Sequence, residues 1–191
     1  MTASPTALMA LTARPGLARA LGAVRSAEIG LLRAVALDLV ALGPASAADA
    51  PADAAGGALQ ELGPEAIEVL RRVIGPTSLD LQAHSTRDGR ATTFLARAGH
   101  GVVVSAHLSL IPGERPEHLR AALRIVGTHG SMLVDLLRPQ LEVRTAAGAT
   151  HVPFGEPGPA DPSAIPPGGP SDALSGIAES ARSGRRLTIT W

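Results

Sequence analysis

The sequence predicts an α+β fold, in which an open, mainly antiparallel mixed sheet carries helices on one of its faces. Between residues 78 and 145, short segments alternate apolar and polar side chains and are separated by turn residues, a pattern typical of consecutive strands. Toward both ends of the chain, apolar residues recur at helical spacing instead. The chain has 191 residues, of which 45% are hydrophobic, so we expect one domain over residues 1–191.

The N-terminal part is predicted to contain a helix, a strand and a loop. Residues 15–26 open with Pro15, which suits a first helical position, and continue with apolar residues at helical spacing. Residues 31–42 are apolar and β-branched enough for a strand, although their alanines leave a helix open. Residues 45–57 are rich in Ala, Asp, Pro and Gly, so we expect a mobile loop that could act as a lid.

Residues 56–75 place two carboxylates at the start of a predicted buried helix. Two glycines supply a flexible entry, and Pro64 suits the first helical position because its missing N–H is not needed there. Glu61 and Glu65 lie one helical turn apart, where two carboxylates in an apolar crevice could donate and accept a proton. The competing interpretation is that both are solvated residues favoured by the helix dipole.

The remaining elements are predicted from the alternation of apolar and polar residues and from the turn residues that separate the segments. We expect strands at residues 78–86, 91–98, 101–110, 119–127, 130–137, 140–145, 151–154 and 186–191. The first three form an antiparallel meander. Residues 155–170 are too rich in proline and glycine for a regular element and form a surface loop, and residues 171–182 form a helix.

The second face of such a sheet is predicted to be an interface. The side chains that alternate with the apolar ones in residues 78–86 and 101–110 are a mixture of polar and apolar types. A moderately apolar surface of this kind is typical of contacts between proteins. Because twofold symmetry is the commonest soluble assembly, we expect a homodimer through this face.

Composition excludes several classes of function. The 17 basic residues balance 17 acidic ones, and only three aromatic residues are present, which is unlike a nucleic-acid binder or a protein of anionic membranes. Cysteine and lysine are both absent, which excludes thiol nucleophiles, thiolate metal sites and Schiff bases. The first residues lack the pattern of a secretory signal, and no long apolar run is present, so we expect a cytoplasmic protein.

Four segments in order resemble the C-terminal substrate and oligomerisation domain of the Gfo/Idh/MocA oxidoreductase family. They are residues 25–30 (RSAEIG), 56–75 (GGALQELGPEAIEVLRRVIG), 125–135 (IVGTHGSMLVD) and 179–189 (ESARSGRRLTI). The first resembles the entry to the family's first substrate-domain strand, and the second resembles the start of its substrate helix. The third resembles a hairpin and the fourth the closing helix and strand. The resemblance spans nearly the whole chain.

The sequence also departs from this family. Members carry an N-terminal Rossmann domain with a G-x-G-x-x-G turn and a catalytic lysine, and neither is present in this sequence. At the substrate helix, Glu61 stands at the position of the family's Asp and Glu65 at that of its His. The resemblance therefore implies a protein without its own nicotinamide cofactor, and an autonomous hydride-transfer enzyme is not expected.

Two functions remain open. In the first, the chain is a substrate-binding or dimerising subunit that pairs with a separate oxidoreductase bearing a Rossmann domain. In the second, the pocket serves redox-neutral chemistry, such as isomerisation, elimination or cyclisation, with Glu61 and Glu65 as base and acid. A truncated gene product without function is the null version of the first hypothesis.

Other residues are candidates for binding a small-molecule ligand. We expect His84 and His107 to face the same side of adjacent strands and to line a cavity with Asp80, although such residues are more often interfacial. Arg124, like two other arginines, could bind an anionic group. The remaining histidines lack the spacing of metal ligands, so no metal site is predicted.

Overall fold

The computed structural model describes residues 11–43, 57–112, 118–138, 140–153 and 170–191. In these residues nine strands form one sheet in the order β8-β7-β6-β5-β1-β4-β3-β2-β9. The strands are β1 (Leu32–Gly43), β2 (Ser78–Ser85), β3 (Ala91–Ala98), β4 (Val103–Pro112), β5 (Arg120–Gly127), β6 (Gly130–Asp135), β7 (Gln140–Thr145), β8 (Gly148–Pro153) and β9 (Leu187–Thr190). Among the strand pairs of the described residues, only β1 with β4 is parallel, so the predicted open, mainly antiparallel mixed sheet is confirmed.

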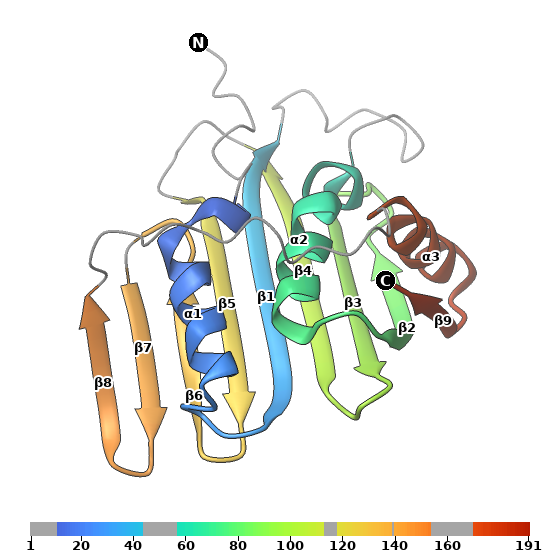
Figure 1. Cartoon of the computed structure of the whole chain (residues 1–191). Helices are drawn as coiled ribbons and strands as arrows, with labels where there is room; N and C mark the ends of the chain where they lie inside the picture. The colour runs from blue at the N-terminus through green and yellow to red at the C-terminus, as the bar shows by residue number, and fades with distance from the viewer. Residues whose placement is uncertain (1–10, 44–56, 113–117, 139, 154–169) are drawn as a thin grey trace.

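Three α-helices of the described residues pack on one face of this sheet, as predicted (Figure 1). They are α1 (Pro15–Arg25), α2 (Ala58–Ile74) and α3 (Pro170–Ser183), and a short 3₁₀ turn, η2 (Leu11–Ala13), precedes α1. The core lies between the two layers, and in β1 every second side chain from Val35 to Ala41 is buried against the helices. The alternate side chains of each strand therefore form a second face, which we call the open face.

The core is aliphatic, as the composition predicts. In the described part of the chain Phe94 is the largest fully buried side chain, and most of the other large ones are leucines. Burying such side chains is the main term that holds the two layers together. None of the helices in the described ranges has both the length and the apolarity needed to cross a bilayer.

The largest difference from the predicted elements concerns α2, which begins at Ala58 and contains Pro64 in its interior. A proline inside a helix costs about 3 kcal/mol, because it removes one backbone hydrogen bond and crowds the preceding turn. The helix starts earlier because Ala58 and Leu62 are already buried on its sheet-facing side, while Pro64 is exposed. Packing of the whole helix therefore outweighs the local preference of proline.

The boundaries of the other elements lie closer to those predicted from the sequence. Two strands, β3 and β7, begin and end at the predicted residues. The last strand before the proline-rich segment is longer than predicted and spans Gly148–Pro153. The two predicted loops, residues 45–57 and 155–170, fall almost entirely outside the described residues.

Candidate functional site

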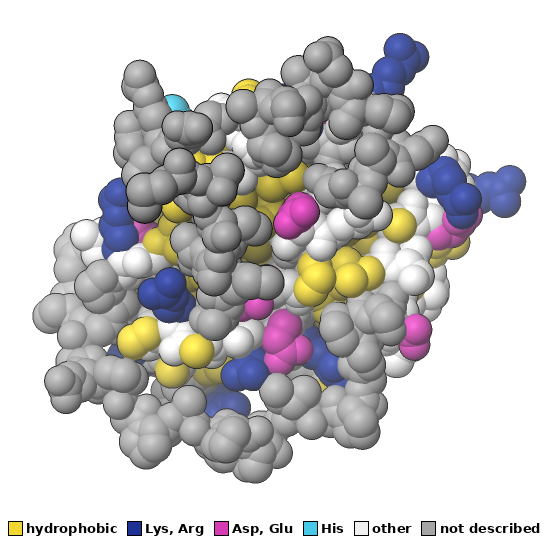
Figure 2. All heavy atoms as spheres, turned by 90° about the horizontal axis from the view of Figure 1, so that it is seen from above, with side chains coloured by type: hydrophobic (Ala, Val, Ile, Leu, Met, Phe, Trp, Pro, Cys, Tyr) yellow, Lys and Arg dark blue, Asp and Glu magenta, His cyan; other side chains and the backbone are white. Residues whose placement is uncertain are grey.

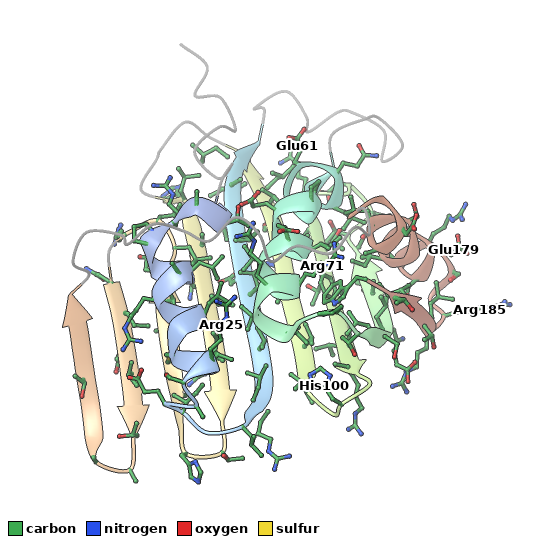
Figure 3. The ribbon with its side chains drawn as sticks, viewed as in Figure 1. Arg25, Glu61, Arg71, His100, Glu179 and Arg185 are labelled. Atoms are coloured by element: carbon green, nitrogen blue, oxygen red, sulfur yellow. The ribbon has the colours of Figure 1, made fainter. Side chains whose placement is uncertain are left out.

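Glu61 and Glu65 lie near the N-terminal end of α2, at the end of the molecule toward which β1 runs (Figures 1 and 3). Glu61 is exposed, and Glu65 is half-buried. The backbone N–H of Thr12 donates a hydrogen bond of 3.0 Å to Oε1 of Glu65. This bond ties the carboxylate to η2, so Glu65 has a structural task whether or not it also meets a ligand.

The two carboxylates can act on a ligand only from this end of the helix. Residues four apart in a helix lie on the same side, so Glu61 and Glu65 are neighbours on the surface of α2. Seen from above, this end of the molecule carries acidic side chains beside hydrophobic ones (Figure 2). Such an arrangement can bind hydroxyl groups or a cation and can exchange a proton with a bound molecule.

The predicted ligand residues of the strands lie on the open face, on the other side of the sheet. The register places His84 of β2 opposite Thr93 of β3, and Thr93 opposite His107 of β4. The expectation that the two histidines occupy adjacent strands is therefore wrong, because β3 runs between β2 and β4. The Oγ1 atom of Thr93 lies 2.9 Å from Nδ1 of His107, within hydrogen-bond distance.

A depression of about 500 Å³ lies in the middle of the open face, and we call it the central depression. Its polar lining consists of Asp38, Thr93, Ser105, His107, Arg120 and Arg124. Three alanines, Leu37 and Leu133 form the rest of its wall. An ion pair of 3.1 Å joins Nε of Arg120 to Oδ2 of Asp38. The volume lies within the range of ligand pockets, which is about 300–1,000 Å³.

Only two of the four predicted ligand residues reach this depression. His107 and Arg124 line it, whereas His84 and Asp80 do not. Asp80 lies toward the edge of the sheet, where it accepts a hydrogen bond of 2.6 Å from the hydroxyl of Thr188 on β9. The expected cavity between His84, His107 and Asp80 is thus replaced by one that His107 shares with residues of β1 and β5.

The structure therefore separates the predicted residues into two groups. Glu61 and Glu65 belong to the helix layer, whereas the histidines, Asp80 and Arg124 belong to the open face. The sheet lies between the groups, so one small ligand cannot contact both.

Sequence reasoning missed Asp38 and Thr93 as members of the depression. From Ala34 to Gly43, Asp38 is the one charged residue of β1, which was the available signal that this side of the strand is not core. Thr93 carried no comparable signal, because its role depends on its place between two histidine-bearing strands.

A smaller hollow of about 80 Å³ adjoins Arg124 and is lined by Glu142 and Arg144. The carboxylate of Glu142 accepts a hydrogen bond from the guanidinium of Arg144 and raises the pKa of Arg144 above its usual value. Within the described ranges, no three or more histidine or acidic side chains gather closely enough to hold a metal ion.

Comparison with known proteins gives a clear result for the fold only. No protein-family model matches the sequence. A search of curated proteins finds no match either. Solved structures of oxidoreductases do match.

A Thermotoga maritima protein classed as an oxidoreductase matches 92% of this chain with a TM-score of 0.73 and 20% identity. Levoglucosan dehydrogenase in complex with NADH and L-sorbose matches 97% of it with a TM-score of 0.71 and 17% identity. An oxidoreductase from Agrobacterium radiobacter, in complex with NAD⁺, L-tartaric acid and magnesium, matches 93% with a TM-score of 0.60 and 18% identity.

The likeness covers this chain almost completely but covers those structures only in part. The chain spans 61%, 64% and 62% of the length of the three proteins, respectively. The fold is therefore one that forms part of larger oxidoreductases, and the resemblance to the C-terminal domain of the Gfo/Idh/MocA type is confirmed for the fold.

Proposed function

We propose that this chain is a substrate-binding and dimerising unit of an oxidoreductase-like assembly, in which a separate partner supplies the dinucleotide-binding domain. The observation that carries the proposal is the partial coverage of the matching structures, which include complexes with NADH or NAD⁺. The part of those proteins that this chain matches is about three fifths of their length. We propose that the coenzyme-binding site of those proteins lies in the part of their length that this chain does not match.

The turn at Gly127 and Gly130 does not fit a nicotinamide dinucleotide. Such a coenzyme needs a glycine-rich turn between a strand and a helix, so that its pyrophosphate meets the helix N-terminus. The glycines at 127 and 130 lie instead in a hairpin between the antiparallel strands β5 and β6. We therefore do not propose that this turn binds a coenzyme.

The substrate class that we propose is a small polyhydroxylated molecule. Two of the matching structures are complexes with L-sorbose and with L-tartaric acid, which are a sugar and a hydroxy acid. Glu61 is the better placed ligand residue on α2, since its carboxylate is exposed while that of Glu65 already bonds to Thr12. Carboxylates are suitable acceptors for sugar hydroxyls.

The open face is the surface that we assign to dimerisation. Three of the four exposed large hydrophobic side chains of the described residues, Leu95, Val103 and Leu133, lie on it. The nine strands are 4 to 12 residues long, and at about 4.8 Å between strands and about 3.3 Å per residue they cover on the order of 1,000 Å². A standard interface buries about 800 Å² of each partner, so the face is large enough for a stable pair.

The charges of the open face also favour a second copy of the same chain. Its described strands carry four arginines and four carboxylates, namely Arg97, Arg120, Arg124, Arg144, Asp38, Asp80, Asp135 and Glu142. A face with this balance does not repel its own copy, because each sign can meet the other across a twofold axis. A face built for a strongly charged partner would carry an excess of one sign.

The mass of the particle in solution tests this part of the proposal. Light scattering after size exclusion should give twice the chain mass of 19.3 kDa. A single-chain mass at all concentrations would remove the homodimer, and the open face would then belong to the contact with the partner. The cytoplasmic location remains a prediction from the sequence.

The alternative function is cofactor-independent acid–base chemistry by Glu61 and Glu65. The observation that favours it is their position side by side on α2 with one carboxylate anchored and the other exposed. Glu61→Gln should abolish turnover of a substrate without changing the melting temperature, because the Glu61 side chain is exposed. Glu65→Gln should also lower the melting temperature, because it weakens a hydrogen bond from a backbone N–H. Turnover that both variants keep would refute the assignment.

A further inference from the structure

We propose that two copies of this chain meet through their open faces with the twofold axis running along β1, so that Leu133 of each copy packs on Leu95 of the other. This inference rests on the part of the proposed function that assigns the open face to a homodimer, and it adds the register of the two sheets. In this register the central depression lies in the middle of the interface, and the two leucines lie on either side of it.

The place of β1 in the sheet carries the first step. Among the nine strands of the described residues, β1 is the middle one, with four strands on either side. A twofold axis that lies between two stacked sheets and runs along their middle strands places β5 opposite β4 of the second copy, and β6 opposite β3. The two faces then overlap over their whole width, at the separation of about 10 Å that stacked sheets have.

One row of side chains across the open face has the symmetry that this axis requires. From β6, β5, β1, β4 and β3 in turn, the register aligns Leu133, Arg124, Ala36, Ser105 and Leu95. Leu133 and Leu95 thus lie two strands to either side of Ala36, and they are 46% and 59% exposed. Rotation about an axis above Ala36 places each leucine on the other, so the dimer buries two such apolar pairs.

A neighbouring row shows the same symmetry. From β7 to β2 along the sheet, the register aligns Arg144, Ser131, Val126, Ala34, Val103, Arg97 and Asp80. Rotation about the same axis, which passes above Ala34, places Val126 opposite Val103 of the second copy. It also places Arg144 opposite Asp80 of the second copy. Apolar side chains therefore meet each other, and so do charges of opposite sign, as in complementary interfaces.

The residues on the axis do not repel their own copies. On the open-face side of β1 these residues are Ala34, Ala36, Asp38 and Val40. Asp38 is the charged one among them, and its ion pair of 3.1 Å with Arg120 offsets its charge within each copy. The two copies of Asp38 can therefore approach each other across the axis.

Away from the axis, the other charged side chains of β3 to β7 meet uncharged polar ones. The register gives the pairs Arg97–Ser131, Arg120–Ser109, Arg124–Ser105, Asp135–Thr93 and Glu142–Gln82, each between the two copies. Hydroxyl and amide groups can donate or accept a hydrogen bond as each charge requires. The axis along β1 thus leaves no like charges of these strands opposite each other except the neutralised Asp38.

An axis across the strands fits the charges less well. Such an axis keeps leucine on leucine only if it runs along the row of Leu133 and Leu95. Every residue of that row would then meet its own copy, so Arg124 would face Arg124, and Glu142 would face Glu142. Like charges that face each other weaken an interface, so the axis along β1 is favoured.

A designed charge pair at positions 95 and 133 tests this register. Leu133→Glu alone and Leu95→Arg alone each place a charge against a leucine of the second copy, twice per dimer. The double variant instead places the new carboxylate against the new guanidinium across the axis. Leu133→Glu with Leu31→Arg is the matched control, because it carries the same new charges, while Leu31 is an exposed leucine that precedes β1 and lies outside the open face.

Sedimentation equilibrium measures the Kd of each dimer, and circular dichroism shows that each variant is folded. Each single variant should raise the Kd at least about 100-fold, because it loses two apolar contacts and buries two unpaired charges. The double variant should regain at least about tenfold in affinity over either single variant, because its opposite charges pair. The control should stay as weak as Leu133→Glu. The reversed pair, Leu133→Arg with Leu95→Glu, should regain affinity in the same way and repeats the test if one variant does not fold.

A double variant that dimerises no better than the single variants would overturn the register. A double variant weaker than both single variants would indicate an axis across the strands, because like charges would then meet. Equal recovery in the control would overturn the register as well. Failure of the proposed function would look different, since the wild-type protein itself would then have a single-chain mass, and the register would fall with the homodimer.

Discussion

Truncation of Leu133 tests the open face as an interface most sharply. The Leu133 side chain lies on β6 at the rim of the central depression and is 46% exposed. Fully burying a leucine contributes about 1.5–3 kcal/mol, so covering the exposed part contributes about 0.7–1.4 kcal/mol. A twofold interface uses the residue twice, which gives about 1.5–3 kcal/mol per dimer.

Leu133→Ala should therefore raise the Kd of the dimer about 10- to 100-fold, because each 1.4 kcal/mol is a factor of ten. Sedimentation equilibrium over a range of concentrations measures this Kd. Below the Kd, where both proteins are single chains, the melting temperature should change little, since Leu133 is already 46% exposed there. Leu31→Ala is the matched control, because Leu31 is 70% exposed and lies before β1, outside the open face.

The reasoning would be refuted if both leucine variants had the same effect on the Kd. It would also be refuted if Leu133→Ala left the Kd of a wild-type dimer unchanged.

Two stability predictions follow from single positions. Gly127→Ala should lower the free energy of unfolding by about 1–3 kcal/mol, because the new Cβ would lie 2.2 Å from the carbonyl oxygen of Ile29. Gly22→Ala in α1 should raise the free energy of unfolding by about 0.5–1 kcal/mol, because nothing lies within 4 Å of the Cβ that alanine would add. Urea melts measure both changes, and a Gly22→Ala variant no more stable than Gly127→Ala would contradict both estimates. Asp88→Asn should destabilise the protein only above the pH at which Asp88 titrates. A hydrogen bond from the Thr86 hydroxyl, helped by the backbone N–H of Arg90, holds the pKa of Asp88 below its ordinary value of 3.8. A depressed pKa in the folded state stabilises the fold above 3.8 and loses this effect as the pH falls through the lowered pKa, so thermal melts of wild type and variant should converge in acid.

Local patterns in the sequence predict most strands and the sheet class, because alternation is a property of neighbouring residues. Strand β3 is an example, since Thr92, Phe94 and Ala96 are buried while the side chains between them are exposed. The start of α2 could not be found in this way, because Pro64 is a local signal for a helix start. Leu62 is one of the buried residues of α2, and its burial depends on how the helix packs on the rest of the fold, which neighbouring residues do not specify.

The candidate site was less accessible to sequence reasoning than the fold. Glu61 and Glu65 could be found because they are close in the sequence. The central depression could not, because it needs Asp38 from β1, His107 from β4 and Arg124 from β5. These strands become neighbours only through the parallel pairing of β1 with β4, a crossover that no local pattern specifies.

Titration of the purified 191-residue chain with NADH tests the central claim most directly. The account predicts no heat of binding and no change in NADH fluorescence, since the proposed partner, and not this chain, carries the strand-turn-helix site that binds the pyrophosphate. Binding of NADH to the chain alone with a micromolar Kd would contradict it.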